Sequence, residues 1–476
     1  MSTRYKGSIM SATAAATSSS AAMGAWRPNE AMQAQTAGAW PGGGPPPNVQ
    51  FLLVAGGGSG GNNYSGGGGA GGFVTSSSQT VASATSYTVT IGAGATAPTS
   101  INGPYTAGSN SVFSAASSSP AIGGGGGGCN GYLSYAGGPG GSGGGAGYTS
   151  GGTGGSGTSG QGNSGGSADP SANFGGGGGG ASAAGSGGSG TTGAGGNGTS
   201  VSFSAVSFAG TGNTSTSVNL TITAVSAGAA LPGTQITGSG VPASTGIVSQ
   251  LTATNTGSVQ ATFSATFVSL TSPVSNVTLS SFTVGSINSV VVGQFVQPIT
   301  GIPVNTFVTA VNTGTSVITL SNPITATVSG SAILYTAGQT GTYTLNNATT
   351  TTLTATALTS TGVYFSGGGG GWARSQATTI AGLGGGANGK TSGVGASGTP
   401  NTGGGGGGTG PNTSGIGGNG GSGVLIISYI NSFNNLGSVG SGLVCNGSAG
   451  NTTPNTTIKP GYKTYVFTAG TGTISW

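Results

Sequence analysis

The fold is decided by residues 51–72, FLLVAGGGSGGNNYSGGGGAGG, a short apolar run followed by two glycine tracts. Glycine supplies 109 of the 476 residues, and similar tracts return at 123–128, 175–180, 367–371 and 403–408. Glycine loses more backbone entropy on folding than any other residue and has no side chain to bury. A chain this rich in glycine is therefore either a disordered linker or a lattice of closely packed backbones.

Composition favours the lattice over the linker. Gly/Ser-rich tracts commonly form flexible coil, and disordered chains combine high net charge with low hydrophobicity. This chain has a net charge of only +5 and 34% hydrophobic residues. Aromatic residues also interrupt the glycine tracts, namely Tyr64, Phe73, Tyr132, Tyr135, Tyr148, Phe174 and Trp372.

Glycine-rich segments can pack as polyproline-II-like helices, which have three residues per turn and no internal hydrogen bonds. Without Cβ atoms such helices approach closely and satisfy one another's N–H and C=O groups, assisted by weak Cα–H···O contacts. Collagen is excluded because glycine does not recur at every third position and the chain has only 20 prolines. The sequence predicts a mainly β, fibre-like protein with a polyglycine-II-type lattice, an inserted β module and almost no helix.

Apolar segments bracket the glycine-rich body. Residues 51–55 open it and residues 424–429, VLIISY, close it. We expect these two segments to pair, so that the lattice and the inserted module both loop out of one small sheet. Two further strands are predicted at 86–91, where apolar residues alternate on one face, and at 111–114.

Changes in composition divide the chain into five segments. They are an N-terminal segment (1–47), the first part of the glycine-rich body (48–210), an inserted β-rich module (211–363), the second part of the body (364–430) and a C-terminal β segment (431–476). The inserted module contains an internal repeat, because GTQITGSGVP at 233–242 is echoed by GQFVQPITGIP at 293–303. In each copy a threonine, Thr245 or Thr306, follows three positions after the proline. The second copy continues into 311–320, which predicts two strands around a tight turn.

The N-terminal segment contains the one plausible helix, at 28–37. Pro28 suits a first helical turn, and Glu30 complements the helix dipole. Trp26 and Trp40 bracket this stretch, which we interpret as a docking module with Trp26, Arg27, Pro28 and Trp40 as its contact residues. The alternative is a disordered tail.

The charged residues exclude several classes of function. The chain has no histidine, and its two carboxylates, Glu30 and Asp169, lie far apart in the sequence. General acid–base catalysis and metal sites need clusters of such groups, so we expect no enzyme activity, no metal and no cofactor. The seven cations are scattered, which argues against nucleic-acid binding. No run of 18 apolar residues and no convincing signal peptide is present, so no membrane insertion is predicted.

The remaining candidate residues are aromatic residues and cysteines. Tyr132, Tyr135, Tyr148 and Trp372 are candidates for stacking on sugars at lattice loops; the alternative is that they fill gaps between glycine helices or join subunits. Near the C-terminus we expect a small β core from Tyr462, Tyr465, Phe467 and Trp476. Cys129 and Cys445 are expected to be small buried thiols, although pairing between them stays open.

Several of these segments resemble one family. They are FLLVAGGG at 51–58, GSGVLIISY at 421–429, GYKTYVFT at 461–468, ISW at 474–476 and GAWRPNEA at 24–31. Together, and in this order, they resemble the glycine-rich tail-fibre-like structural proteins (adhesins) of bacteriophages, especially phages of cyanobacteria.

The resemblance implies a non-enzymatic virion fibre protein that mediates attachment to the host cell surface. The expected receptor is a host surface polysaccharide or an outer-membrane receptor. We expect a homotrimer, assembled in the host cytoplasm and docked through its N-terminus on tail or baseplate proteins. One alternative is a head or neck decoration fibre with a purely structural role. Another is a secreted bacterial surface adhesin or matrix protein, which would require an export signal.

Overall fold

The protein is mainly β, as the composition predicts. The computed structural model describes residues 16–17, 22–23, 44–99, 105–130, 135–148, 152–168, 174–187, 193–200, 209–227, 235–242, 245–251, 259–266, 275–290, 294–302, 306, 308–320, 324–335, 341–345, 348–359, 363–373, 378–411, 416–456, 459 and 461–476. Within these residues the helical structure is one short 3-10 turn, η2 (Ile287–Ser289). The predicted helix at 28–37 lies outside them.

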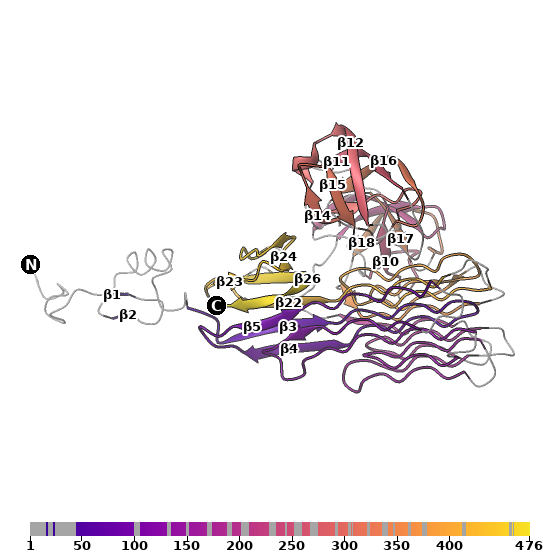
Figure 1. Cartoon of the computed structure of the whole chain (residues 1–476), viewed down its shortest axis with the longest axis horizontal. Helices are drawn as coiled ribbons and strands as arrows, with labels where there is room; N and C mark the ends of the chain where they lie inside the picture. The colour runs from indigo at the N-terminus through magenta and orange to yellow at the C-terminus, as the bar shows by residue number, and fades with distance from the viewer. Residues whose placement is uncertain are drawn as a thin grey trace, which may run out of the picture.

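An antiparallel sheet forms the base of the body (Figure 1). Strand β3 (Asn48–Val54) pairs along β22 (Val424–Ile430), with Leu53 opposite Leu425, which confirms the pairing predicted for the two bracketing segments. Strand β4 (Phe73–Thr80) lies on the other side of β3, and β26 (Tyr462–Ser475) lies on the other side of β22.

The long strand β26 joins this sheet to a second group of strands. Its first half pairs with β22, and its second half pairs with β5 (Tyr87–Thr90). The remaining strands of this nine-stranded sheet are β6 (Val112–Phe113), β23 (Ser438–Val439), β24 (Leu443–Cys445) and β25 (Ser448–Ala449). The strands predicted near 86–91 and 111–114 are therefore present as β5 and β6, and the C-terminal part of the chain completes the same sheet.

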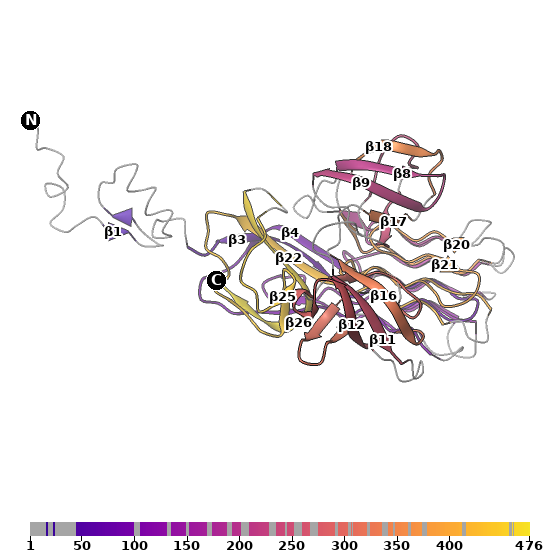
Figure 2. The same cartoon turned by 90° about the horizontal axis from the view of Figure 1, so that it is seen from above.

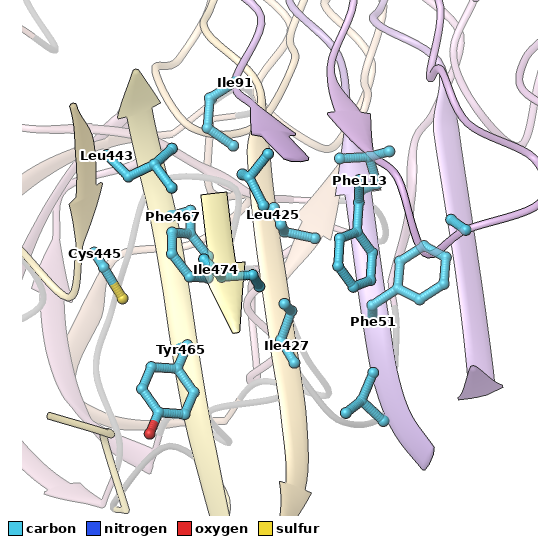
Figure 3. Close-up of a cluster of buried hydrophobic side chains, with 14 of the residues drawn as sticks. Phe51, Ile91, Phe113, Leu425, Ile427, Leu443, Cys445, Tyr465, Phe467 and Ile474 are labelled. Carbon is cyan, nitrogen blue, oxygen red and sulfur yellow. The ribbon is translucent and has the colours of Figure 1, made fainter. Parts of the chain in front are cut away.

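One face of the sheet carries the main hydrophobic core (Figure 3). Because side chains alternate along a strand, Phe51 and Leu53 of β3 point to the same face as Leu425 and Ile427 of β22. The residues that pack against them are Ile91, Phe113, Leu443, Cys445, Tyr465, Phe467 and Ile474. Tyr465 and Phe467 are part of this core as expected, and the partly buried Trp476 packs against Tyr87 and Tyr429. Tyr462 instead lies under the ammonium group of Lys459.

Beyond the sheet the chain continues as a lattice of glycine-rich segments, drawn as wavy tubes at the right of Figure 1. Successive N–H groups of residues 67–72 donate to three neighbouring segments in rotation. The acceptors are the carbonyl oxygens of Gly176, Gly406, Gly125, Gly179, Gly403 and Ile122, in that order. Each neighbour recurs every third residue, as three residues per turn require. Some neighbouring segments run parallel to residues 67–72 and others run antiparallel. The return of each neighbour at every third residue confirms the predicted polyglycine-II-type packing.

The lattice depends on the absence of side chains. A Cβ atom built on Gly68 would lie 2.2 Å from the carbonyl oxygen of Gly58, and one on Gly178 would lie 1.9 Å from that of Gly68. These distances are far below van der Waals contact. The Cα–H groups therefore point at neighbouring carbonyls, in the direction of weak Cα–H···O contacts.

The inserted region leaves the body through a short antiparallel pair, β7 (Thr199–Ser200) with β19 (Tyr364–Phe365). It contains two separate sheets, which Figure 2 shows as two groups of strands. The five-stranded sheet consists of β8 (Ala209–Thr214), β9 (Asn219–Ala227), β10 (Ile247–Gln250), β17 (Gly341–Leu345) and β18 (Leu353–Thr359). The six-stranded sheet consists of β11 (Val259–Ala265), β12 (Asn276–Val284), β13 (Phe295–Val296), β14 (Val308–Asn312), β15 (Val317–Leu320) and β16 (Val328–Tyr335). The tight hairpin predicted within 311–320 is the one between β14 and β15.

Two small strand pairs lie outside these sheets. Strand β1 (Ala16–Thr17) pairs with β2 (Ala22–Met23), and β20 (Thr378–Thr379) pairs with β21 (Gly389–Lys390). Cys129 and Cys445 are both buried, which confirms the expected small buried thiols. Burial raises the pKa of both thiols, that of Cys445 to about 12.

Candidate functional site

The end of the lattice remote from the sheet is built around a turn at Asn63 and Tyr64. Strand β3 leads into residues 55–62, the chain reverses at this turn, and residues 65–72 lead back into β4. At about 3.1 Å per residue, eight residues of extended glycine helix place the turn roughly 25 Å from the sheet. Both turn residues have left-handed backbones, with φ of 55° and 50°. Asparagine adopts this conformation readily, whereas tyrosine does so only when its surroundings hold it there.

Hydrogen bonds hold the turn against three other segments. The carbonyl oxygen of Tyr64 accepts from the N–H of Tyr148 at 2.7 Å, and that of Ser65 accepts from the N–H of Trp372 at 2.8 Å. The side-chain amide of Asn63 donates to the carbonyl oxygen of Asn130 at 3.1 Å. Segments that lie far apart in the sequence therefore meet at this end of the lattice.

Three rings pack together at this point, and we call Tyr64, Tyr148 and Trp372 the aromatic cluster. The ring centroids of Tyr64 and Trp372 lie 4.7 Å apart, edge to face, and those of Tyr148 and Trp372 lie 5.7 Å apart. The Tyr64 and Tyr148 rings are 5.8 Å apart. Edge-to-face pairs of this kind contribute about 0.5–1.5 kcal/mol beyond the burial of their surface. The cluster thus stabilises the meeting point of the segments.

Trp372 does not lie where a sugar could stack on it. Its side chain is only 2% exposed, and among the described residues its indole Nε1–H has no hydrogen-bond partner. The indole packs over the backbone of Gly410, where an added Cβ would lie 2.3 Å from Nε1. The burial of this ring does not favour Trp372 as a glycan contact. Its ring fills a gap between glycine segments, which was the alternative reading of these aromatics.

Tyrosines supply the accessible aromatic surface near the cluster. Tyr64 and Tyr148 are partly exposed, and Tyr135 is 45% exposed. The carbonyl oxygen of Tyr135 accepts from the N–H of Gly147 at 2.9 Å, which places Tyr135 on the segment beside Tyr148. Tyr132 lies outside the described residues. Tyr64 was not among the candidates chosen from the sequence, although the Asn-Asn-Tyr interruption of the first glycine tract is the signal that could have identified it.

The described cations include two lysines at the opposite end of the sheet, both engaged with protein groups. Lys459 Nζ donates to Gln50 Oε1 at 2.7 Å and lies 3.6 Å from the ring centroid of Tyr462. Lys463 Nζ donates to the carbonyl oxygen of Phe433. Burial lowers the pKa of both lysines. Both ammonium groups therefore contact other groups of the protein.

The described residues show neither a metal-binding cluster nor a membrane-spanning helix. Within the described ranges, no group of three or more His, Cys, Asp or Glu residues is placed to hold a metal ion. In the same part of the chain, no helix has the length and apolar character needed to cross a membrane. The proposed docking residues Trp26, Arg27, Pro28 and Trp40 all lie outside the described residues.

Comparisons with known proteins identify one region of the chain. Neither the curated proteins nor the solved structures gave a match. Residues 32–264 match a family model described as a glycine-rich domain. This match covers the first part of the glycine-rich body and extends into the inserted sheets. The chain thus contains a glycine-rich domain over residues 32–264.

Proposed function

We propose that the protein is a non-enzymatic bacteriophage virion fibre protein that attaches the particle to the surface of its host cell. The observation that carries this proposal is the position of the accessible tyrosines. Tyr64, Tyr135 and Tyr148 lie at the remote end of a lattice whose backbone groups are bonded to one another. A rigid scaffold whose N–H and C=O groups are hydrogen-bonded to one another, with aromatic residues at its tip, is suited to presenting a binding surface.

The chemistry of this end fits a glycan. A tyrosine ring offers an apolar face to the C–H groups of a sugar and a hydroxyl to its polar groups. No charged residue lies between Glu30 and Asp169, the part of the chain that contains all three tyrosines. The exposed Lys390 lies on a neighbouring segment, where its N–H donates to the carbonyl oxygen of Gly408. Trp372 supports the site from behind, because its buried ring fixes the orientation of Tyr64 and Tyr148.

The opposite end of the sheet suits docking on the virion. The chain enters the sheet at Asn48, the end of β3 remote from the lattice, so residues 1–47 precede that end. The proposal assigns tail or baseplate contacts to this segment and places the protein in an external fibre. It also includes a homotrimer, since β4 and β25 are edge strands of the sheet and unpaired edges favour association.

The proposal is tested by binding of the purified full chain to surface polysaccharide from cyanobacterial host strains. Tyr135→Ala removes an exposed ring outside the aromatic cluster, and we expect binding to weaken about tenfold, equivalent to the loss of about 1.4 kcal/mol. The matched control is Tyr462→Ala at the other end of the sheet, which should bind as the unmodified protein does.

Two outcomes would count against this function. If the unmodified protein binds neither host cells nor their polysaccharide, the adhesin role is lost. Antibody labelling of virions would then show whether the protein is a head or neck fibre or is not on the particle at all. If Tyr135→Ala and Tyr462→Ala bind equally well, the attachment surface lies elsewhere on the chain.

A further inference from the structure

The two sheets of the inserted region share one topology. We call β8, β9, β10, β17 and β18 the outer module, and β11, β12, β14, β15 and β16, with the added strand β13, the inner module. The order across the outer sheet is β10-β17-β9-β8-β18, and the order across the inner sheet is β14-β15-β12-β11-β16. When the five shared strands of each module are numbered in chain order, both sheets therefore have the order 3-4-2-1-5. Every pairing is antiparallel. This order does not follow from chain adjacency, so its recurrence is informative.

The repeated sequence segments adopt the same turn in both modules. Gly240 and Gly301 occupy equivalent positions with φ of 80° and 88°. The carbonyl oxygen of Gly240 accepts from the N–H of Thr350, and that of Gly301 accepts from the N–H of Thr325, both at 2.9 Å. A left-handed residue is needed at this position in each copy, which explains why glycine recurs there.

A second pair of hydrogen bonds closes the same loop. The N–H of Ile236 donates to the carbonyl oxygen of Thr245 at 2.9 Å, and the N–H of Val296 donates to that of Thr306 at 2.8 Å. Both threonines are fully buried. The threonine three residues after each proline is therefore a structural element of the module.

Strand registers and cores also correspond. Ile247 pairs with Leu345, Val308 pairs with Leu320, and in both cases the register shifts at the next residue. Equivalent positions are buried in both modules: Leu220 and Val277, Ile222 and Leu279, Ile236 and Val296, Ile247 and Val308, Tyr343 and Ile318, Leu345 and Leu320, and Leu353 and Val328. These residues fall into two separate hydrophobic cores, one for each module.

The inner module lies inside a hairpin of the outer one. In the inner module the hairpin between the third and fourth strands has a short turn, in which Asn312 Oδ1 accepts from the N–H of Gly314 at 3.1 Å and of Thr315 at 3.2 Å. In the outer module the same hairpin remains paired up to Leu251, whose N–H donates to the carbonyl oxygen of Thr342 at 2.7 Å. The chain between these two residues, in place of a short turn, contains the entire inner module.

We propose that the inner module is a second copy of the outer module, inserted into its hairpin turn, and that each copy folds as an independent unit. The hairpin turn is then an extension point, at which a whole module can be added or removed without disturbing the sheet that carries it. Because the inner module lies beyond the outer one in Figure 1, each addition lengthens an arm on one side of the lattice. This arm is separate from the tyrosine-bearing end of the lattice and does not depend on the function proposed for that end.

The first test removes the inner module from the full-length protein. Residues 251–341 are replaced by Asn-Thr-Gly-Thr-Ser, the sequence of the inner turn at 312–316. We expect the outer module and the lattice to keep their amide protection and resistance to protease. A control deletes only 259–284, which removes β11 and β12 and should unfold the remainder of the inner module. Rapid exchange of the outer-module amides in the five-residue-turn variant would overturn the proposal.

The second test adds a module. A further copy of residues 252–341 replaces the inner turn residues 313–316, the position equivalent to the natural insertion. A soluble protein in which all three modules show protected strand amides is the expected result. If the added copy unfolds the inner module that receives it, the hairpin is not an extension point.

Discussion

Gly178→Ala tests the close packing of the lattice most severely. The added Cβ would lie 1.9 Å from the carbonyl oxygen of Gly68, whereas Cβ contacts under 3.0 Å are essentially never seen, so the two segments must separate by about 1.1 Å. The Gly178 N–H donates to the carbonyl oxygen of Gly369 at 2.8 Å, and the Gly369 N–H donates to that of Gly68 at 2.9 Å. A movement of this size breaks bonds of this kind.

The expected cost follows from the bonds lost. Each backbone hydrogen bond contributes about 0.5–1.5 kcal/mol net, and each buried group left unpaired costs about 1–3 kcal/mol. Two or three broken bonds give about 2–5 kcal/mol, a large part of the roughly 5–15 kcal/mol that stabilises a typical domain. The assay is the urea midpoint of unfolding, together with amide exchange of residues 175–180.

The matched control is Gly330→Ala in β16, where an added Cβ meets nothing within 4 Å. Alanine is favoured over glycine in a strand by about 0.5–1 kcal/mol, so this variant should be as stable as the unmodified protein or slightly more stable. Equal urea midpoints for Gly178→Ala and Gly330→Ala would refute the reasoning, because they would show that the lattice segments are not in close contact.

Three further predictions concern the sheet, the thiol and the insertion. Leu425→Ala leaves a cavity at a fully buried position and should lower the free energy of unfolding, measured by urea titration, by about 2–5 kcal/mol. The control is Ile430→Ala on the same strand, where the side chain is 50% exposed; this variant should lower the free energy of unfolding by less than about 1 kcal/mol. Burial raises the pKa of Cys445 from 9.0 to about 12, so its contribution to stability is present below pH 9 and is lost as the pH rises toward 12. The urea midpoint of Cys445→Ala should accordingly fall less steeply above pH 9 than that of the unmodified protein, and equal slopes would contradict this. Replacing residues 201–362 by a short Gly/Ser linker should leave the lattice amides protected, because Ser200 and Tyr364 are directly opposed; loss of protection would show that the insertion supports the body.

Much of the body could be predicted because its determinants are local. The runs at 51–55 and 424–429 are short, apolar and rich in β-forming residues, and they bracket the glycine tracts, so their pairing followed from sequence. The lattice followed from glycine itself, since few other arrangements satisfy the backbone groups of a folded chain with so few side chains.

What could not be predicted depends on segments distant in sequence. Trp372 was expected to be exposed, but it is buried and packs against Tyr64 and Tyr148. Its neighbours could not be predicted, because glycine tracts of similar composition do not indicate which segments become adjacent in the lattice. The repeat at 233–242 and 293–303 was visible, whereas the nesting was not. The strand that completes the outer hairpin, β17, follows the whole inner module, so the sequence order conceals the pairing of β10 with β17.

The central claim is that a rigid glycine lattice presents a binding surface at its remote end. The most direct test is hydrogen–deuterium exchange of the full chain, with and without host surface polysaccharide. In the free protein, slow exchange is predicted for the lattice amides of residues 66–72 and 175–180. On addition of polysaccharide, further protection should appear around residues 63–65 and 135–148 and not in β22 or β26. Rapid exchange throughout the lattice, or protection confined to the sheet, would contradict the account.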